Sequence, residues 1–451
     1  MPISCENELI PQINRNVPTG LAVHTMQWRG ELLTMNRLIW LQKKATTINQ
    51  PLRKKIQQAY LPGRKSMEIP VIIQFKQKIT APGLHALQKR LGQHSFSIIR
   101  RLPLLNAVSS KVSVKCLERM CGCREVGKIY LDSIKKTSLY IATPSIGSTA
   151  VQRERGLTGK GINIAILDTG VYAHPDLTRP VNRIIAFKDY INHRKQPYDD
   201  NGHGTHIAGD AAGNGWMSKG KYRGPAPKAG IVGVKVLDSN GYGYDSTIIK
   251  GIEWCIRQRK RLKLRILSLS LGGPVNSTCD DDPLCQAVEK AVQAGLVVVI
   301  AAGNSGPGRG SIESPGNSPT AITVGAVDDR RSLRQADDRI TWYSSRGPTL
   351  NGRHKPDLVA PGETIISLRA PNSRLNHELP YLRIGKGYFV LSGTSISTPI
   401  VSGAAAQLLQ RNPSLSPSQV KAILKRNAFR LGLRANTAGS GEINVRFLCS
   451  P

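Results

Sequence analysis

The stretch LSGTSISTPIVSGAAA, residues 391–406, decides the fold. Small and apolar residues continue to Leu409, and no charged side chain occurs before Arg411. A helix without charge on any face is buried, so this stretch predicts a core helix. Ser395 follows Gly-Thr near its start, where unpaired N–H groups and the helix dipole favour negative charge. Pro399 is expected in the first turn, where a missing backbone N–H costs nothing.

A serine at this position has two interpretations. Its hydroxyl can cap the helix by accepting a backbone hydrogen bond. Alternatively, it can act as a nucleophile whose intermediate carries an oxyanion stabilised by nearby N–H groups. Because a serine hydroxyl is a poor nucleophile until a base removes its proton, the choice depends on whether the chain also supplies a base and an acid.

Upstream of this stretch, continuous apolar segments alternate with helical patterns. Strands are expected at residues 162–168, 229–238, 265–271, 296–303 and 321–328, and helices at 246–258 and 284–295. This alternation predicts a three-layer α/β domain whose mainly parallel central sheet is flanked by helices. In such sheets the chemistry collects at the carboxyl ends of the strands, where Asp168 and Asn304 both lie.

An earlier segment follows a different pattern. It predicts a strand at 71–76, a helix at 81–93, two strands within 95–112, a helix at 113–123 and a strand at 127–132. This order is that of a small α+β, ferredoxin-like domain. Residues 1–66 show weak helical periodicity around 32–41 and 51–61 and predict a partly helical extension. Residues 133–160 are polar and turn-rich, which predicts a linker.

Three further stretches place polar side chains among small, turn-forming residues. Asp168 ends its strand in DTG, His203 lies in DNGHGTHIAG at 200–209, and Asn304 lies in AAGNSG at 301–306. Each residue alone fits a structural role in a turn or loop. Together with Ser395 they supply an acid, a base, an amide donor and a nucleophile. Their chain order Asp, His, Ser is the order of subtilisin.

At this point a family resemblance emerges. The blocks AILDTGV, HGTHIAG, AAGNSG and GTSISTP are similar to the signature blocks of the subtilisin-like serine proteases, over residues 137–445. The resemblance implies a serine endopeptidase of polypeptide substrates with the catalytic triad Asp168, His203 and Ser395. It implies an oxyanion hole formed by Asn304 and the backbone N–H of Ser395. Structural roles are expected for the remaining histidines near these blocks, His174 and His206.

The resemblance also divides the chain. Residues 67–136 resemble the inhibitory propeptide of the family, preceded by the extension 1–66 and followed by a peptidase domain at 137–451. This domain order and the short extensions resemble the AprX-like branch. It implies a self-processed precursor in which the propeptide is an intramolecular inhibitor, with autocleavage expected near Lys136. The alternative is an inactive pseudoprotease that binds peptides without cutting them.

Substrate contacts follow from the same resemblance. In SLSLGGP the matching residues are Ser270, Leu271 and Gly272, and GYG supplies Gly241 and Gly243 from the opposite side. Glycine lets two backbones approach, so the peptide is expected to bind as an added strand.

One departure from the family concerns Glu313. It falls near the floor of the P1 pocket, at a position that is usually small. A carboxylate there predicts a preference for Lys or Arg at P1, and Lys135-Lys136 near the processing site agrees with this. The alternative is that Glu313 is turned to solvent.

A second departure concerns calcium. Residues 213–227, where the family's tight calcium loop would lie, are basic and poor in oxygen ligands, although Asp176 matches one ligand. We therefore expect no required cofactor or metal and no tight calcium site. Weak calcium binding at the acidic cluster Asp280–Asp282 remains an alternative.

Composition sets the remaining expectations. The 451 residues carry a net charge of +33 with a pI of about 10.2, and residues 1–136 hold 23 Lys and Arg against 7 Asp and Glu. These charges are scattered without an aromatic-basic platform, so nucleic acid is not expected as a partner, although the basic extension leaves it as an alternative.

The sequence contains no run of 18 apolar residues, so it predicts no membrane span, and the N-terminus has no apolar signal segment. We therefore expect a cytoplasmic protein, with export by a non-classical route as the alternative. The dispersed cysteines favour a reducing compartment, although Cys279 and Cys285 flank a tight acidic loop and could pair if oxidised.

Overall fold

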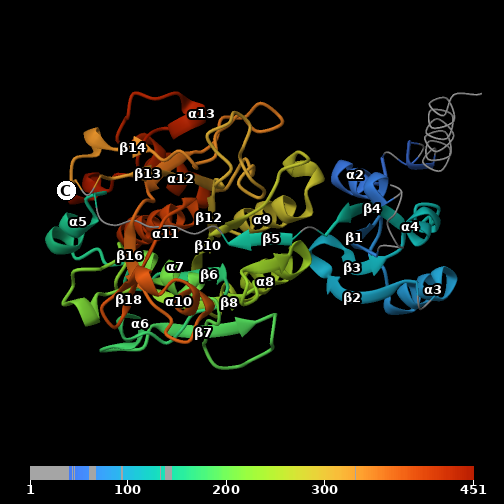
Figure 1. The fold of residues 1–451 in the computed structure, drawn as a ribbon, viewed down its shortest axis with the longest axis horizontal. Helices are drawn as coiled ribbons and strands as arrows, with labels where there is room; N and C mark the ends of the chain where they lie inside the picture. The colour runs from blue at the N-terminus through green and yellow to red at the C-terminus, as the bar shows by residue number, and fades with distance from the viewer. Residues whose placement is uncertain are drawn as a thin grey trace, which may run out of the picture.

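The computed structural model describes residues 40–42, 44, 46–59, 68–92, 95–132, 134–137, 145–330 and 332–450. The helical periodicity expected around 32–41 lies almost entirely outside these residues. Figure 1 shows that the described chain forms a large unit and a smaller N-terminal unit, with strand β5 (Ile134–Thr137) reaching from the small unit into the large one.

The large unit is built on an eight-stranded sheet of the order β14-β13-β12-β10-β6-β8-β7, with β15 also paired to β13. Every neighbouring pair is parallel except β13 with β14, which confirms the predicted mainly parallel sheet. The strands are β6 (Asn163–Asp168), β7 (Ile184–Asp189), β8 (Gly230–Lys235), β10 (Leu264–Leu269), β12 (Val297–Ala301), β13 (Ile322–Asp328), β14 (Arg339–Ile340) and β15 (Leu358–Pro361).

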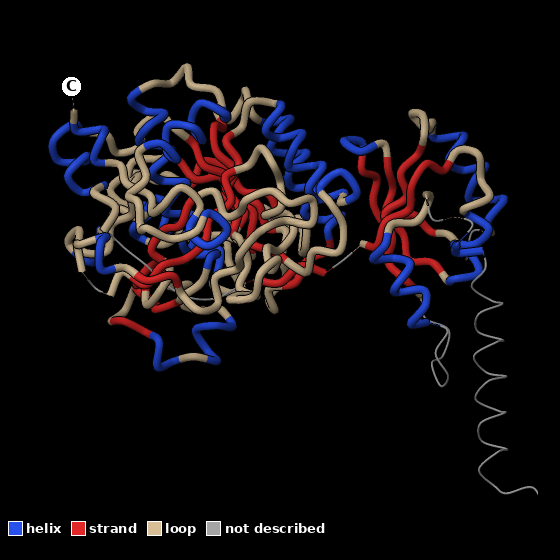
Figure 2. The backbone as a smooth tube through the Cα atoms, turned by 90° about the horizontal axis from the view of Figure 1, so that it is seen from above, coloured by secondary structure: helices blue, strands red, loops and turns tan. Residues whose placement is uncertain are grey.

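Helices cover both faces of this sheet, which Figure 2 shows as a red layer between blue helices. In β6, Ile164 and Ile166 face one apolar core together with α7 (His203–Ala212), α11 (Thr394–Arg411) and α12 (Pro417–Arg426). Ala165 and Leu167 face the opposite core with α8 (Asp245–Gln258) and α9 (Pro283–Gln293). Burial of both strand faces explains why the strands read as continuous apolar runs.

Several elements were not expected from the sequence. The predicted linker at 133–160 contains α5 (Ser148–Arg155), whose Val151 is buried in the main core. A small antiparallel sheet has the order β16-β18-β17. The other short elements are β16 (Ile365–Leu368), β17 (Arg383–Ile384), β18 (Tyr388–Leu391), α6 (Pro175–Thr178), α10 (Arg374–Glu378) and α13 (Ala435–Ala438).

The N-terminal unit is an antiparallel sheet of the order β2-β3-β1-β4 with two helices, which is the predicted strand and helix order. Its elements are β1 (Ile69–Phe75), α3 (Ala81–Leu91), β2 (Ser97–Leu102), β3 (Ala107–Val112), α4 (Val114–Met120) and β4 (Val126–Leu131). Helix α2 (Gln50–Ala59) packs on the same core through Leu52 and Ile56. Part of the predicted extension thus shares the core of this unit.

The two units are joined by an apolar contact. Ile72, Leu102 and Tyr130 of the small unit belong to the same buried cluster as α8 and α9. The carboxylate of Asp132 accepts a hydrogen bond of 3.0 Å from the backbone N–H of Ser246, in the first turn of α8. This contact places a negative charge at a helix N-terminus, where the dipole favours it.

Candidate active site

The end of β6 and the start of α7 bring the first two predicted catalytic residues together. Asp168 is the last residue of β6, and His203 is the first residue of α7. The Nδ1 of His203 lies 2.8 Å from Oδ1 of Asp168, and both side chains are fully buried. The carboxylate fixes the proton on Nδ1, which leaves Nε2 as the basic nitrogen.

Helices α7 and α11 pack against each other. Both begin at the carboxyl ends of parallel strands, since His203 contacts Asp168 at the end of β6 and Ser395 contacts Ser270 just after β10. At Gly403 of α11, an added Cβ would lie 2.6 Å from the carbonyl oxygen of Ala211 in α7. The number of residues from Ser395 to Gly403 in α11 equals the number from His203 to Ala211 in α7. The close contact between the helices therefore brings the start of α11, with Ser395, level with the start of α7.

Ser395 lies in the first turn of α11, and its hydroxyl does not cap the helix. The N-cap is Gly393, and the buried Oγ of Ser395 makes no hydrogen bond to any described residue. Its backbone N–H is one of those with no acceptor within the helix. The structure thus leaves a hydroxyl and an N–H available at the same place.

Pro399 lies inside α11 and not in its first turn as expected. Since proline has no N–H, the carbonyl of Ser395 loses its partner within the helix. The hydroxyl of Ser270 replaces it, donating a hydrogen bond of 2.5 Å to that carbonyl. Tertiary structure compensates here for a proline that local rules would exclude.

Asn304 follows β12 and is held by Thr394. Its Oδ1 accepts hydrogen bonds of 3.0 Å from both the backbone N–H and the hydroxyl of Thr394. The Thr394 hydroxyl in turn accepts from the N–H of Gly303 at 3.2 Å. This arrangement orients the amide so that Nδ2, the donor, points away from Thr394.

The predicted substrate-binding residues lie beside these groups. A three-stranded sheet has β5 in the middle, between β9 (Tyr242–Tyr244) and β11 (Leu271–Gly272). Leu271 and Gly272 pair with Thr137 and Lys136, and Gly243 pairs with Lys135. Gly241 precedes β9 in a turn with φ of +78°. The structure therefore shows an added strand made by the chain itself.

Glu313 is half-buried and not turned to solvent. Its Oε1 accepts hydrogen bonds from the N–H of Asn304 at 3.0 Å and the hydroxyl of Ser305 at 2.7 Å. A Cβ added at Gly272 would lie 2.8 Å from Oε2, and one added at Gly303 would lie 2.5 Å from Cδ. The carboxylate therefore lies between β11 and the turn that carries Asn304, in contact with both glycines.

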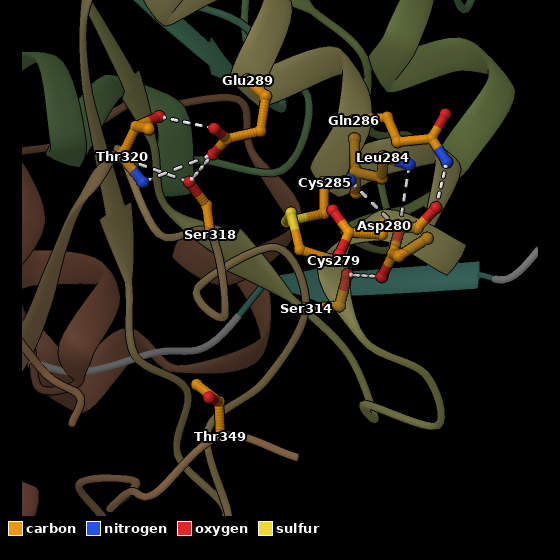
Figure 3. The surroundings of a disulfide bond; sticks show 12 residues. Cys279, Asp280, Leu284, Cys285, Gln286, Glu289, Ser314, Ser318, Thr320 and Thr349 are labelled. Atoms are coloured by element: carbon orange, nitrogen blue, oxygen red, sulfur yellow. Dashed lines mark hydrogen bonds between the residues drawn. A yellow bond between two sulfur atoms is a disulfide. The ribbon is translucent and has the colours of Figure 1, made fainter. Parts of the chain in front are cut away.

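A disulfide lies close to Ser314, the residue that follows Glu313 (Figure 3). Cys279 and Cys285 are bonded, so the pairing left open by the sequence is present. Between them Asp282 accepts hydrogen bonds from the N–H groups of Leu284 and Cys285, which start α9, and from the hydroxyl of Ser314. Asp282 thus ties the disulfide loop to the residue that follows Glu313.

The residues around Asp176, the position that matches a calcium ligand of the family, do not fit a calcium ion. The carboxylate of Asp176 accepts hydrogen bonds from the N–H of Met217 at 3.0 Å and the hydroxyl of Tyr388 at 2.8 Å. Both oxygens are therefore engaged by donors, whereas calcium needs six to eight free oxygen ligands. Among the described residues, no group of three or more His, Cys, Asp and Glu side chains could hold a metal ion.

Comparison with known proteins agrees with this arrangement. The model of the subtilase family matches residues 159–447, which includes Asp168, His203 and Ser395. The chain is 41% identical over 431 residues to serine protease AprX of Bacillus subtilis, covering 90% of this chain and 96% of AprX. The chain belongs to the subtilase family. It is a subtilisin-like serine protease, a hydrolase, and a homologue of AprX.

Further subtilisins are also similar to this chain. Subtilisin E of Bacillus subtilis is 31% identical over 393 residues, covering 85% of this chain and 91% of subtilisin E. Subtilisin Savinase of Lederbergia lenta is 38% identical over 292 residues, covering 64% and 91%. Fervidolysin of Fervidobacterium pennivorans shares the fold with a TM-score of 0.67 at 22% identity, and the match covers 87% of this chain and 62% of fervidolysin.

The subtilase site also depends on Asp199, which sequence reasoning did not select. Its buried carboxylate accepts from the hydroxyl of Thr169 after β6 and from the N–H groups of Gly202 and Thr205 around the start of α7. It thereby fixes the strand end that carries Asp168 against the helix start that carries His203. The signal was present as the acid pair directly before NGH, but that pattern also fits an ordinary turn.

The two other histidines near the family blocks, His174 and His206, make local contacts. Nδ1 of His174 accepts the N–H of Asp176 and caps α6, and Nδ1 of His206 lies 2.7 Å from the carboxylate of Asp210. Burial lowers the pKa of His174 and raises the pKa of Asp210.

In the part of the chain that the structure describes, none of the helices has both the length and the apolar surface that a membrane span needs.

Proposed function

We propose that this subtilase is a serine endopeptidase that acts through an Asp168–His203–Ser395 triad and an acyl-enzyme. The Nε2 of His203 takes the proton from the Ser395 hydroxyl while Oγ attacks the peptide carbonyl carbon. The oxyanion accepts hydrogen bonds from Nδ2 of Asn304 and the N–H of Ser395. His203 then protonates the leaving amine, and a water molecule hydrolyses the ester by the same steps in reverse.

The observation that carries this proposal is the uncommitted hydroxyl of Ser395. A serine that only capped α11 would accept a backbone hydrogen bond, and this one does not. It lies at the helix end next to the start of α7, whose first residue, His203, is held by Asp168. Nucleophilic catalysis needs a free hydroxyl beside a base that an acid orients. The structure forms the Asp168–His203 half of this relation, while its hydrogen bonds between described residues do not include one between His203 and the Ser395 hydroxyl.

Labelling with a serine-directed phosphonate tests the assignment. We expect one adduct, mapped by mass spectrometry to the peptide containing Ser395, and loss of peptidase activity with labelling. Ser395→Ala should take no label. Ser414→Ala, which changes an exposed serine beyond the end of α11, should take the label and cleave peptide normally. A label on another residue, or undiminished activity of Ser395→Ala, would refute the triad.

We also propose that the chain is a precursor whose N-terminal unit inhibits it. Strand β5 fills the place between β9 and β11 that a substrate strand would take, and it is directly continuous with the small unit. Since Lys136 and Thr137 pair with Gly272 and Leu271, the chain passes the nucleophile shortly after Thr137. Self-cleavage is therefore expected within a few residues beyond Lys136.

We further propose a preference for Lys or Arg at P1, based on Glu313. Its carboxylate contacts Gly272 of the substrate-pairing strand and lies beside Asn304, so it faces the space next to the nucleophile. A charge-assisted hydrogen bond to a cationic side chain would form there. Lys135 and Lys136 belong to the strand ladder in the structure, so the proposal depends on Glu313 and not on them.

A further inference from the structure

A strongly basic cavity lies on the large unit, away from the triad. It has a volume of about 650 Å³, and no Asp or Glu lines it among the described residues. Its lining includes six cationic residues: Lys160, Arg179, Arg183, Lys219, Arg223 and Lys228. In the part of the chain that the structure describes, none of the six forms an ion pair with a carboxylate side chain. Their charge is therefore available to a ligand.

Arg183 forms a fixed positive base for this cavity. Its Nη1 donates to the carbonyl oxygens of Ala212 at 2.7 Å and Ala229 at 3.0 Å, and its Nη2 donates to that of Asp176. Burial lowers the pKa of Arg183 to about 10, so it stays charged at neutral pH. Since Ala212 ends α7 and His203 begins it, the cavity is about 15 Å from the triad.

Two arginines of this cavity contact Asn214, one through its backbone and one through its side chain. Asn214 donates through Nδ2 to the main-chain carbonyl of Arg179, and the main-chain carbonyl of Asn214 accepts from Nε of Arg223 at 3.3 Å. Both arginines are exposed and line the cavity. A guanidinium matches two oxygens of one phosphate, so two exposed arginines on one cavity suit a phosphorylated ligand better than a single carboxylate.

The cavity also has an exposed apolar wall. Trp216 is 53% exposed and Val181 is 68% exposed, and both line the cavity with Pro180 and Pro227. The backbone N–H of Trp216 donates to Oδ1 of Asn214, the residue that also contacts the backbone of Arg179 and the side chain of Arg223. An indole left in solvent beside fixed cations offers a surface for a flat ring.

We propose that this cavity binds a nucleotide, with its phosphates on Arg179 and Arg223 and its base on Trp216. A nucleoside diphosphate supplies about three negative charges and one flat ring, which together use both walls. The cavity volume falls in the range of sites for small ligands, roughly 300–1,000 Å³. This inference does not depend on the peptidase chemistry, because it uses none of the catalytic residues.

Calorimetric titration of the full-length Ser395→Ala chain with ADP tests the proposal. We expect one ADP per chain and weaker binding as salt is raised. The double variant Arg179→Gln/Arg223→Gln should weaken ADP binding by about tenfold or more. Lys221→Gln is the matched control, since this exposed lysine is in the same loop, contacts the ring of Tyr222 and does not line the cavity.

The two halves of the ligand can be separated with tripolyphosphate and adenosine. Trp216→Leu should weaken ADP binding and leave tripolyphosphate binding unchanged, and adenosine alone should bind more weakly than ADP. Absence of ADP binding at low salt, or an equal loss in Lys221→Gln, would overturn the proposal. It would also be overturned if only oligonucleotides or anionic vesicles bound, because the surface would then recognise a polymer or a membrane.

Discussion

At the scale of single residues, Ser395 is prepared by neighbours that leave its hydroxyl uncommitted. Gly393 takes the capping position, Ser270 satisfies the Ser395 carbonyl, and Thr394 holds Asn304. None of these three features uses the Ser395 hydroxyl. The hydroxyl is consequently buried beside a polarised helix end, where negative charge on oxygen is favoured.

Glu313 carries the prediction on specificity. Replacement by Gln keeps the shape and removes the charge, so cleavage of peptides with Lys at P1 should lose about tenfold or more in kcat/KM. Cleavage of otherwise identical peptides with Leu at P1 should change little or improve. The measurement is kcat/KM for the two peptides with both enzymes. Equal or faster cleavage after Leu or Phe by the unmodified enzyme would contradict the prediction.

At the scale of elements, α11 and the parallel strands beside it were predicted from the sequence. They are long stretches of small and apolar residues, so their burial is visible locally. Helix α7 also carries His206 and Asp210, and only its start was expected. Strands β16 to β18 are short and pair across intervening loops, so no local sequence pattern predicts them. The bond from Ser270 to the Ser395 carbonyl joins residues 125 positions apart. The residues proposed for the triad could be selected because each is embedded in a short turn motif, whereas their supports, such as Asp199, act through tertiary contacts.

The C-terminal segment that returns to the sheet carries a prediction on pH. Glu442 pairs with Val359 of β15 and with Phe429, and its fully buried carboxyl group faces that of Asp338. Burial and then the Asp338 carboxyl group raise the pKa of Glu442 to about 9. The hydroxyl of Ser145 donates a hydrogen bond of 3.3 Å to Oε1 of Glu442, and the side chain of Gln335 also interacts with this group. We expect the two carboxyl groups to share one proton.

The sign of the effect follows from proton linkage. Unfolded Glu442 has an ordinary pKa near 4.3, so between about pH 4.3 and 9 the folded chain holds a proton that the unfolded chain has lost. The free energy of unfolding should therefore fall as pH rises through this window. In a Ser395→Ala background, Glu442→Gln should reduce the fall in Tm between pH 5.5 and 8.5. Glu378→Gln, at an exposed acid, is the control; an unchanged pH dependence in Glu442→Gln would count against the shared proton.

At the scale of the whole molecule, the two units pack together because the small unit covers apolar surface of the large one. Residues of β1, β2 and β4 complete a cluster with α8 and α9. Strand β5 continues from the small unit and pairs with β9 and β11 of the large unit (Figure 1). Separation would expose this cluster to water, at about 25 cal/mol for each Å² of apolar surface. The small unit is thus expected to stay bound after the chain is cut.

Self-processing is tested by following the purified chain by mass. The unmodified protein should yield a fragment whose N-terminus lies within a few residues beyond Lys136, whereas Ser395→Ala should stay at full length and folded. Mixing the two proteins distinguishes cutting within a chain from cutting between chains. An intact precursor in a fully active sample would show that processing is not required.

The release of the small unit should depend more on Asp132 than on the partly exposed ion pair between Lys128 and Asp281. Asp132 is buried and accepts the Ser246 N–H at the start of α8, whereas the pair of Lys128 with Asp281, at 2.7 Å, is partly exposed. Exposed pairs contribute about 0.2–1 kcal/mol, but a buried carboxylate on a helix N-terminus contributes more, and its loss leaves an N–H without a partner. Asp132→Ala should therefore shorten the lag before the processed protein cleaves added peptide by about tenfold, because dissociation rates carry most of such a change. Lys128→Ala should shorten it by less than about fivefold. Progress curves of the three proteins decide between them, and equal lags would mean that the apolar cluster alone holds the unit in place.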